Sequence, residues 1–256
     1  MRLSLLVLFA GTVAAAFFNR ISCPPIHVLA ARETTAPPGF GSAQALVDLI
    51  LKVFPRATAQ AIDYPAAGGA NYSESVSLGI VAVLSQMQLV SARCPDTILV
   101  MHGYSQGAQI MDDAFCGGPD GSSLPETPPS LVSPSISAKV AAIIFMGDPR
   151  HVVGLPYNVG NATEPGFAAR PVGFQCPAFS SRIQSYCDSP DPFCAKGDDA
   201  ATHQGYPKVY GQQALDFIVS KFMVNKRSGK ISMRGIASVT GVGRCDECGG
   251  RDSECA

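Results

Sequence analysis

The sequence predicts an α/β fold in which a mostly parallel central sheet of about five strands lies between two layers of helices. Short apolar runs that are typical of buried strands alternate along the chain with segments whose apolar residues recur at helical spacing. A Gly-rich turn that carries a serine joins one of these strands to the helix after it. The chain has 256 residues, of which 46% are hydrophobic and 15% charged. This size and composition suit one sizeable globular domain.

The first half of the chain begins with a predicted strand over residues 26–31, which a polar segment and a Pro-Pro-Gly loop follow. A helix over residues 42–54, with Ser42 as its N-cap, carries one apolar stripe and ends before Pro55. A short strand over residues 58–64 and a longer helix over residues 73–92 come next.

The second half begins with an apolar strand over residues 98–101 and, after a Gly-rich break, a helix over residues 108–115. A loop rich in Gly, Pro and Ser (116–135) precedes a buried strand at 140–146. The stretch 147–182 has no regular period, and long loops of this kind are often functional. A last strand at 183–187 and an amphipathic helix around 214–222 complete the domain.

Both ends of the chain differ from this domain. Residues 1–16 combine a basic start, a short apolar core and small residues before a cleavage site, which is typical of a secretory signal peptide. We therefore expect a secreted, extracellular protein with its domain at residues 22–223. Residues 224–256 have no sustained apolar period and are predicted to form a disordered tail.

Charge and cysteine usage limit the partners that we expect. A net charge of −1 and a pI of about 6.4 predict no nucleic-acid or membrane binding, and we expect a monomer. In an oxidising compartment the nine cysteines are disulfide candidates, and their odd number leaves at least one without an internal partner. The tail holds Cys245, Cys248 and Cys255, but no histidine or fourth cysteine completes a metal site around the C-x-x-C pair, so we predict no metal and no cofactor. Asn71 and Asn161 head glycosylation sequons.

The strongest motif is the G-x-S-x-G pentapeptide Gly103-Tyr104-Ser105-Gln106-Gly107, between a predicted strand and a predicted helix. In this context it is typical of the nucleophile elbow of α/β-hydrolases, a sharp turn that presents a serine. Glycines are needed because side chains at the flanking positions would collide with the neighbouring strand or helix. The alternative is an ordinary strand–helix turn that happens to contain a serine.

A nucleophilic serine needs an adjacent base, which a third group orients. Of the four histidines in the chain, we interpret His27, His102 and His151 as structural, with His102 at the strand end pointing away from the serine hydroxyl. His203, which we place in a loop just before the closing helix, follows Ser105 in the chain order of this class and is the expected base.

The acid is expected after the last strand and before His203, where the candidates are Asp188, Asp191, Asp198 and Asp199. A disulfide between Cys187 and Cys194 could clamp the loop that contains the first two, with a stabilisation of roughly 2–3 kcal/mol. An acid inside this ring is better placed than one in the Gly-Asp-Asp turn that follows. The pattern by itself does not choose between Asp188 and Asp191.

Several motifs in register make the chain resemble the fungal cutinase-like serine esterases, and within them the acetylxylan esterase branch. The resemblance covers residues 22–222. The matching segments are Cys23-Pro24 with Ile26-His27-Val28, Ala31-Arg32-Glu33-Thr34-Thr35, the elbow, Phe145-Met146-Gly147-Asp148-Pro149, Ser185-Tyr186-Cys187-Asp188 through Asp191-Pro192-Phe193-Cys194, and Thr202-His203-Gln204-Gly205-Tyr206.

The resemblance implies a cutinase-like three-layer sandwich without a lid, and it selects Asp191 as the acid. It implies an oxyanion hole from the backbone N–H groups of Gln106 and Thr34, the hydroxyl of Thr34 helping to orient it. The implied disulfides are Cys23–Cys94, Cys116–Cys176 and Cys187–Cys194. The chain departs from the branch where Pro65–Gly69 lacks a cysteine, where one of a doubled cysteine is Ala195, and where His102 replaces an aliphatic residue.

The expected activity is that of a secreted serine esterase, which removes acetyl groups from xylan or a related plant cell-wall polysaccharide through an acyl-enzyme. The alternative enzyme is a cutinase that acts on longer acyl chains of a polyester. A hypothesis of another class is a non-catalytic surface-binding protein on a hydrolase scaffold.

Overall fold

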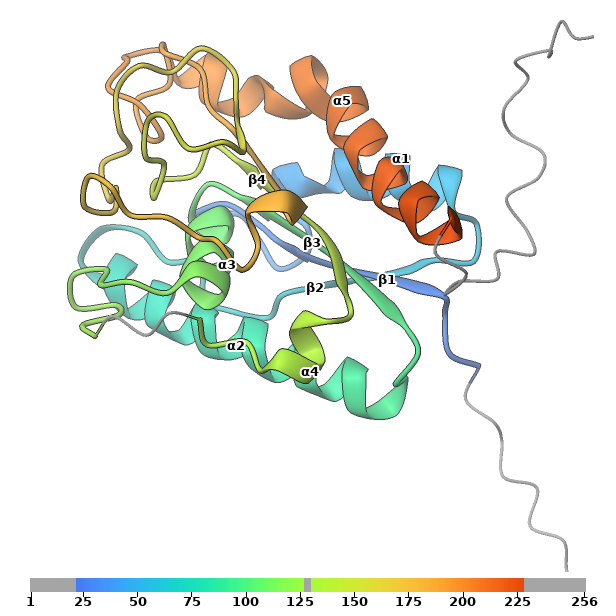
Figure 1. Cartoon of the computed structure of the whole chain (residues 1–256). Coiled ribbons are helices and arrows are strands. Elements are labelled where there is room, and N and C mark those ends of the chain that lie inside the picture. Colours follow the sequence, from blue (N-terminus) through green and yellow to red (C-terminus); the bar gives the residue numbers. More distant parts are fainter. Residues whose placement is uncertain (1–21, 127–129, 228–256) are drawn as a thin grey trace, which may run out of the picture.

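A computed structural model of the protein describes residues 22–126 and 130–227 (Figure 1). Its centre is a six-stranded sheet in the order β2-β1-β3-β4-β6-β5, and every neighbouring pair is parallel. The strands are β1 (Ile26–Ala31), β2 (Thr58–Ala61), β3 (Ile98–Tyr104), β4 (Val140–Met146), β5 (Asn158–Val159) and β6 (Ile183–Tyr186). The helices are α1 (Gln44–Val53), α2 (Tyr72–Arg93), α3 (Gln106–Cys116), α4 (Pro134–Ser137) and α5 (Ala200–Arg227). This is the predicted α/β fold, with one short strand, β5, beyond the five that we expected.

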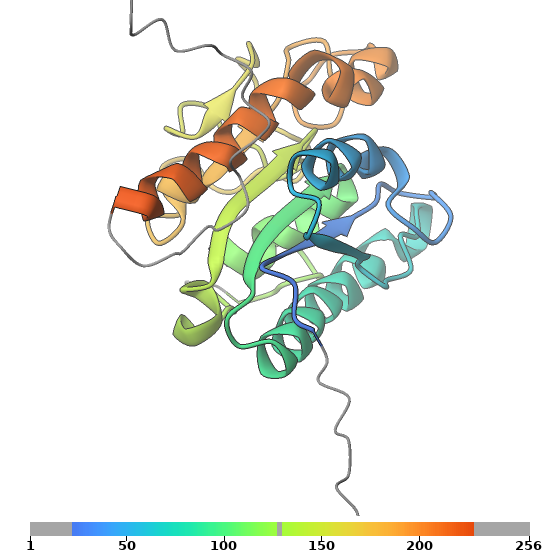
Figure 2. The ribbon, with the colours of Figure 1, turned by 90° about the vertical axis from the view of Figure 1, so that its right-hand side faces the viewer.

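The helices form a layer on each face of the sheet. α1 and α5 cover one face, and α2, α3 and α4 cover the other (Figures 1 and 2). Each layer encloses its own apolar core, one around Ile50 and Phe222, the other around Ile80 and Phe115. Because both faces are covered, β1 and β4 are apolar along almost their whole length rather than alternating.

Helix α2 belongs to the core of one of these layers. By length and composition alone, residues Gly69–Arg93 could cross a membrane, with a mean hydropathy of 1.5 in the most apolar window. In the fold, however, Val76, Ile80, Val83 and Met87 are buried against the core that α3 and the sheet share. The apolar character of α2 is therefore explained by packing inside a globular domain.

Two predicted helix starts are wrong. Ser42 does not cap α1; it lies in a short 3₁₀ turn (Gly41–Ala43), and its amide and hydroxyl donate to the Glu33 carboxylate at 2.8 and 2.9 Å. The closing helix begins at Ala200, so His203 lies in its first turn and not in a loop. Asp199 caps this helix by accepting from the N–H of Ala201 at 2.9 Å. The apolar residues that predicted this helix begin only at Ala214, and the turns before them contain Gly205 and Pro207, residue types that disfavour a helix interior.

Three disulfides tie the domain together, and they join the pairs that the family resemblance implied. They are Cys23–Cys94, Cys116–Cys176 and Cys187–Cys194. The predicted signal peptide, the tail cysteines and most of the predicted tail lie outside the described residues, so these interpretations stay predictions. Helix α5 runs to Arg227, four residues past the boundary expected at 223.

Candidate active site

The predicted elbow is a strained turn between β3 and α3. Ser105 has φ 54° and ψ −121°, a conformation that L-residues rarely adopt, and its N–H donates to Met146 O on β4 at 2.9 Å. A Cβ on Gly103 would come within 2.6 Å of the Ala108 nitrogen in α3. A Cβ on Gly107 would come within 2.6 Å of the Arg32 carbonyl oxygen that follows β1. Both glycines are therefore required by backbone contacts, as the motif predicted.

His203 and Asp191 form a buried hydrogen-bonded pair beside this turn. The Nδ1 atom of His203 lies 2.6 Å from Oδ2 of Asp191, and the Asp191 side chain is completely buried. Since Nδ1 faces the carboxylate, Nε2 is the nitrogen left for another partner. His203 and Ser105 line the same pocket.

The carboxylate of Asp191 is held on both oxygens. Oδ1 accepts from the N–H groups of Phe193 at 2.6 Å and Cys194 at 3.1 Å, and Oδ2 also accepts from the Tyr206 hydroxyl at 2.8 Å. Burial by itself would raise the pKa of Asp191, but the hydrogen bond to His203, its charge and the other donors hold that pKa below its usual value. Asp191 is therefore ionised at neutral pH.

Asp188 and Asp191, between which the sequence pattern did not choose, have different partners in the structure. Asp188 lies in the same disulfide loop, but its oxygens accept from the Tyr210 hydroxyl at 2.8 and 3.0 Å and from the N–H of Asn161 at 3.1 Å. Asp188 therefore joins the loop to Tyr210 on α5 and to Asn161, whereas Asp191 contacts His203. Asp199 caps α5, as described above, and Asp198 has no contact with the histidine among the hydrogen bonds of the described residues.

Two residues without an assigned role in the sequence also hold His203. Gly147 has φ 64°, and a Cβ there would come within 2.6 Å of Cε1 and 2.8 Å of Nδ1 of His203. The Tyr104 hydroxyl donates to the carbonyl oxygen of His203, and the two rings meet edge to face with centroids 5.9 Å apart. The position of Gly147 directly after the buried strand β4 was the sequence feature that could have indicated its close contact with His203. No sequence pattern indicated the contact of Tyr104 with His203.

The segment that contains Thr34 lies beside Ser105, and hydrogen bonds from Arg32 hold it in place. The buried Arg32 guanidinium donates to Ala36 O at 2.9 Å and Tyr64 O at 2.6 Å, so it joins the segment after β1 to the one after β2. The N–H of Thr35 donates to Ala66 O at 2.7 Å. Thr34 lines the pocket with Ser105, as an oxyanion donor must.

Gln106 is the first residue of α3, so its backbone N–H has no acceptor within the helix and lies at the positive end of the helix dipole. Its side chain is buried and makes other contacts: Nε2 donates to Ala67 O at 2.9 Å, and Oε1 accepts from the Ser75 hydroxyl at 3.0 Å. These bonds attach the start of α3 to α2 and to the segment after β2, which Arg32 also holds.

The pocket around Ser105 has a volume of about 900 Å³. Polar side chains from Glu33, Ser42 and Gln204 line it together with the aromatic rings of Tyr72, Phe167 and Phe193. The Phe193 ring packs against His203 with centroids 4.5 Å apart. No group of three or more His, Cys, Asp or Glu side chains in the described part of the chain is arranged to hold a metal ion.

The remaining histidines lie apart from Ser105. His27 in β1 contacts the Thr58 hydroxyl through Nδ1 at 2.7 Å, and burial lowers its pKa. His151 contacts the Asn158 amide through Nε2 at 3.1 Å, and burial also lowers its pKa. His102 is fully buried in β3, with Nδ1 3.2 Å from Ile144 O.

Both sequon asparagines are exposed in the structure. Asn71 ends the 3₁₀ turn before α2. The Oδ1 atom of Asn161 accepts from the N–H of Ser189 at 2.8 Å, and its carbonyl oxygen accepts from the Ser189 hydroxyl. These hydrogen bonds join the segment after β5 to the acid loop. Glycan attachment stays a prediction at both sites.

Comparisons with known proteins agree on one group of esterases. Residues 22–222 match a family model described as cutinase. Cutinase 11 of Verticillium dahliae is 51% identical over 224 residues, an alignment that covers 85% of this chain and 75% of that protein. Acetylxylan esterase 2 of Talaromyces purpureogenus is 50% identical over 206 residues, which cover 78% of this chain and 88% of that protein.

Solved structures of acetylxylan esterases have the same fold. A structure at 0.90 Å resolution is 50% identical with a TM-score of 0.75, and the match covers 78% of this chain and 99% of that one. The catalytic core domain of the enzyme from Trichoderma reesei is 48% identical with a TM-score of 0.75, covering 78% of this chain and 100% of that one.

Proposed function

The chain belongs to the cutinase family and is a carboxylic ester hydrolase, and from this premise we propose that it is a secreted serine esterase that removes acetyl groups from xylan or a related plant cell-wall polysaccharide. The observation that carries the proposal is the buried His203–Asp191 pair in a pocket that also contains Ser105. Three disulfides support secretion, because such bonds persist in oxidising compartments.

In the proposed mechanism, Ser105 Oγ attacks the ester carbonyl carbon and passes its proton to Nε2 of His203. The ionised Asp191 stabilises the imidazolium and keeps the ring in the orientation that leaves Nε2 free. The N–H groups of Gln106 and Thr34 donate to the oxyanion, and each such donor typically contributes about 3–4 kcal/mol to catalysis.

Collapse of the tetrahedral intermediate breaks the bond to the alcohol oxygen, which receives the proton from His203. A water molecule then gives a proton to His203 and attacks the acyl-enzyme, releasing the acid and restoring Ser105. The net reaction consumes one ester and one water and yields one alcohol and one acid, so no cofactor is required.

The test of this function is the activity of Ser105→Ala. We expect hydrolysis of ethyl acetate, followed as acid release, to fall to background because the nucleophile is lost. Ser220→Ala, an exposed serine on α5, is the matched control and should keep full activity. Substantial hydrolysis by the Ser105 variant would contradict the mechanism and favour a non-catalytic role for the elbow.

A second candidate is a cutinase, which hydrolyses longer-chain polyester bonds. The 51% identity to Cutinase 11 favours it as much as the 50% identity to Acetylxylan esterase 2 favours the first. Acetate release from acetylated xylan, with rates on ethyl esters that fall beyond acetate, supports the first candidate. Rates that rise to butanoate and beyond, without acetate release from xylan, support the second.

A further inference from the structure

Phe167 is an exposed aromatic residue at the pocket that contains Ser105. Its side chain is 59% exposed although the ring is large and apolar. It lines the pocket and meets the ring of Tyr72 edge to face, with centroids 5.8 Å apart. Exposed aromatic rings beside a catalytic pocket commonly bind part of a ligand.

The backbone around Phe167 is held firmly although its ring is exposed. The N–H of Phe167 donates to Phe193 O at 3.1 Å, and the N–H of Ala168 donates to Pro149 O at 3.1 Å. Gly166 packs so closely that a Cβ there would lie 2.8 Å from the carbonyl carbon of Pro149. The ring is therefore presented by an ordered segment, as a binding group should be.

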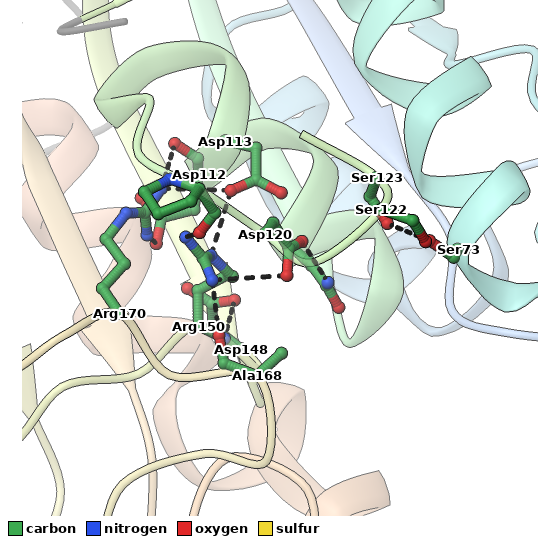
Figure 3. A network of polar contacts seen from close by, with 12 residues as sticks. Ser73, Asp112, Asp113, Asp120, Ser122, Ser123, Asp148, Arg150, Ala168 and Arg170 are labelled. Atoms are coloured by element: carbon green, nitrogen blue, oxygen red, sulfur yellow. Dashed lines mark hydrogen bonds and ion pairs between the residues drawn. The ribbon is translucent and has the colours of Figure 1, made fainter. Parts of the chain in front are cut away.

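A buried network of arginine and aspartate side chains holds the backbone at Ala168, the residue after Phe167 (Figure 3). The Arg150 guanidinium donates to Ala168 O at 2.6 Å, and it pairs with Asp113 at 3.0 Å and with Asp120 at 3.3 Å. Both arginine and aspartate side chains in these pairs are almost fully buried. Arg150 thus links the residue next to Phe167 to α3.

The same network reaches Tyr72. Its hydroxyl donates to Gln109 Oε1, and Gln109 Nε2 donates to Asp120 Oδ2 at 2.6 Å. The Asp120 carboxylate therefore accepts hydrogen bonds from Arg150 and from Gln109. Arg150 in turn holds the backbone next to Phe167, and Gln109 holds the Tyr72 hydroxyl. This shared anchor sets the two rings relative to each other and to α3, which begins directly after Ser105.

The size and lining of the pocket indicate what the rings bind. An acetyl group fills only a small part of about 900 Å³, so most of the space is available to the rest of the substrate. Polar side chains of Glu33, Ser42 and Gln204 line the pocket besides the rings. A sugar ring has apolar C–H faces and hydroxyl edges, so this mixture fits a sugar better than a long acyl chain, which needs a continuous apolar wall.

We propose that Phe167 and Tyr72 form a platform on which a pyranose ring of the polysaccharide lies while its ester is at Ser105. This inference rests on the proposed function, because it assumes that the substrate is an esterified polysaccharide. It assigns Phe167 the role of a specificity-determining residue that acts on the sugar and not on the acyl group.

The test compares Phe167→Ala with the wild type on two acetyl esters, acetylated xylo-oligosaccharides and ethyl acetate. We expect kcat/KM for the oligosaccharides to fall roughly tenfold, mainly through KM, because the contact between the aromatic ring and the sugar is lost; this fold-change corresponds to about 1.4 kcal/mol. Ethyl acetate has no ring to bind, so its kcat/KM should stay within about twofold. Phe167→Tyr should keep the wild-type value on both substrates, because the ring remains.

Val172→Ala is the matched control, since Val172 is a fully exposed apolar residue of the same irregular segment and does not line the pocket. An unchanged kcat/KM of Phe167→Ala on the oligosaccharides, or equal losses on both acetyl esters, would overturn the platform alone. A loss confined to ethyl octanoate would also overturn it, because the ring would then bind the acyl chain. A wild type that hydrolyses ethyl acetate but releases no acetate from the oligosaccharides would overturn the proposed substrate and the platform together.

Discussion

Replacement of His102 by leucine should make the protein less sensitive to acid. His102 is fully buried in β3, its Nδ1 contacts Ile144 O at 3.2 Å, and its Nε2 has no hydrogen-bond partner among the described residues. Burial lowers the pKa of His102 to about 4. The imidazole therefore stays neutral in the folded protein under conditions where it is protonated in the unfolded chain.

The sign and size of the effect follow from this difference in pKa. Between the ordinary value of about 6.5 and the folded value of about 4, the unfolded chain binds a proton that the folded protein does not bind. The free energy of unfolding therefore falls as the pH decreases through this window. At about 1.4 kcal/mol per pH unit, His102 removes about 3 kcal/mol of stability between pH 7.5 and pH 4.

Urea unfolding of wild type and His102→Leu at pH 7.5 and pH 4 measures this contribution. We expect the drop in unfolding free energy between the two pH values to be about 3 kcal/mol smaller in the variant, since leucine does not titrate. Val100→Ala, on the same strand, is the control; it should lower stability by equal amounts at both pH values. Equal pH-dependent drops in wild type and His102→Leu would refute the reasoning.

Three further substitutions test the site and its support. Asp191→Asn should lower kcat for ethyl acetate by roughly 10³–10⁴-fold while Asp188→Asn stays near wild type, and equal rates for the two variants would contradict the assignment of the acid. Gly147→Ala should lower kcat by at least tenfold because its Cβ meets the His203 ring, and an unchanged kcat would show that the ring can shift freely. Arg150→Ala should lower the free energy of unfolding in urea by about 3–5 kcal/mol because the buried Asp120 loses its arginine and Asp113 keeps only Arg170, and a loss under 1 kcal/mol would contradict the role of the charge network.

Hydrogen bonds to the segment after β5 add to the disulfide that holds the acid loop. Asn161 and Ser189 hold the segment after β5 to this loop with two hydrogen bonds, and Asp188 adds a third through the N–H of Asn161. The loop also keeps its own disulfide, Cys187–Cys194. The position of Asp191 therefore depends on contacts of two kinds, one covalent and the other through hydrogen bonds.

The sequence by itself determined the sheet, the elbow and the candidate base. These features depend on neighbours along the chain: apolar runs make the strands, and two glycines beside Ser105 allow a turn that any side chain would block. The same local reasoning identified the disulfide loop, because Cys187 and Cys194 are only seven residues apart. The start of the last helix was expected too late, because the apolar period is visible only from Ala214 although the helix begins at Ala200.

Only the tertiary structure decided which side chains meet across the sheet. Asp188 and Asp191 are equivalent as a pattern, and only the family resemblance selected Asp191; the fold of their loop supplies the physical reason, because it directs Asp191 and not Asp188 to His203. Phe167 lies in a stretch without any period, and its place at the pocket depends on Arg150 and Asp120, which are distant in the chain and near in space. Such pairings depend on long-range packing and on the burial of charge, and no spacing along the sequence records them.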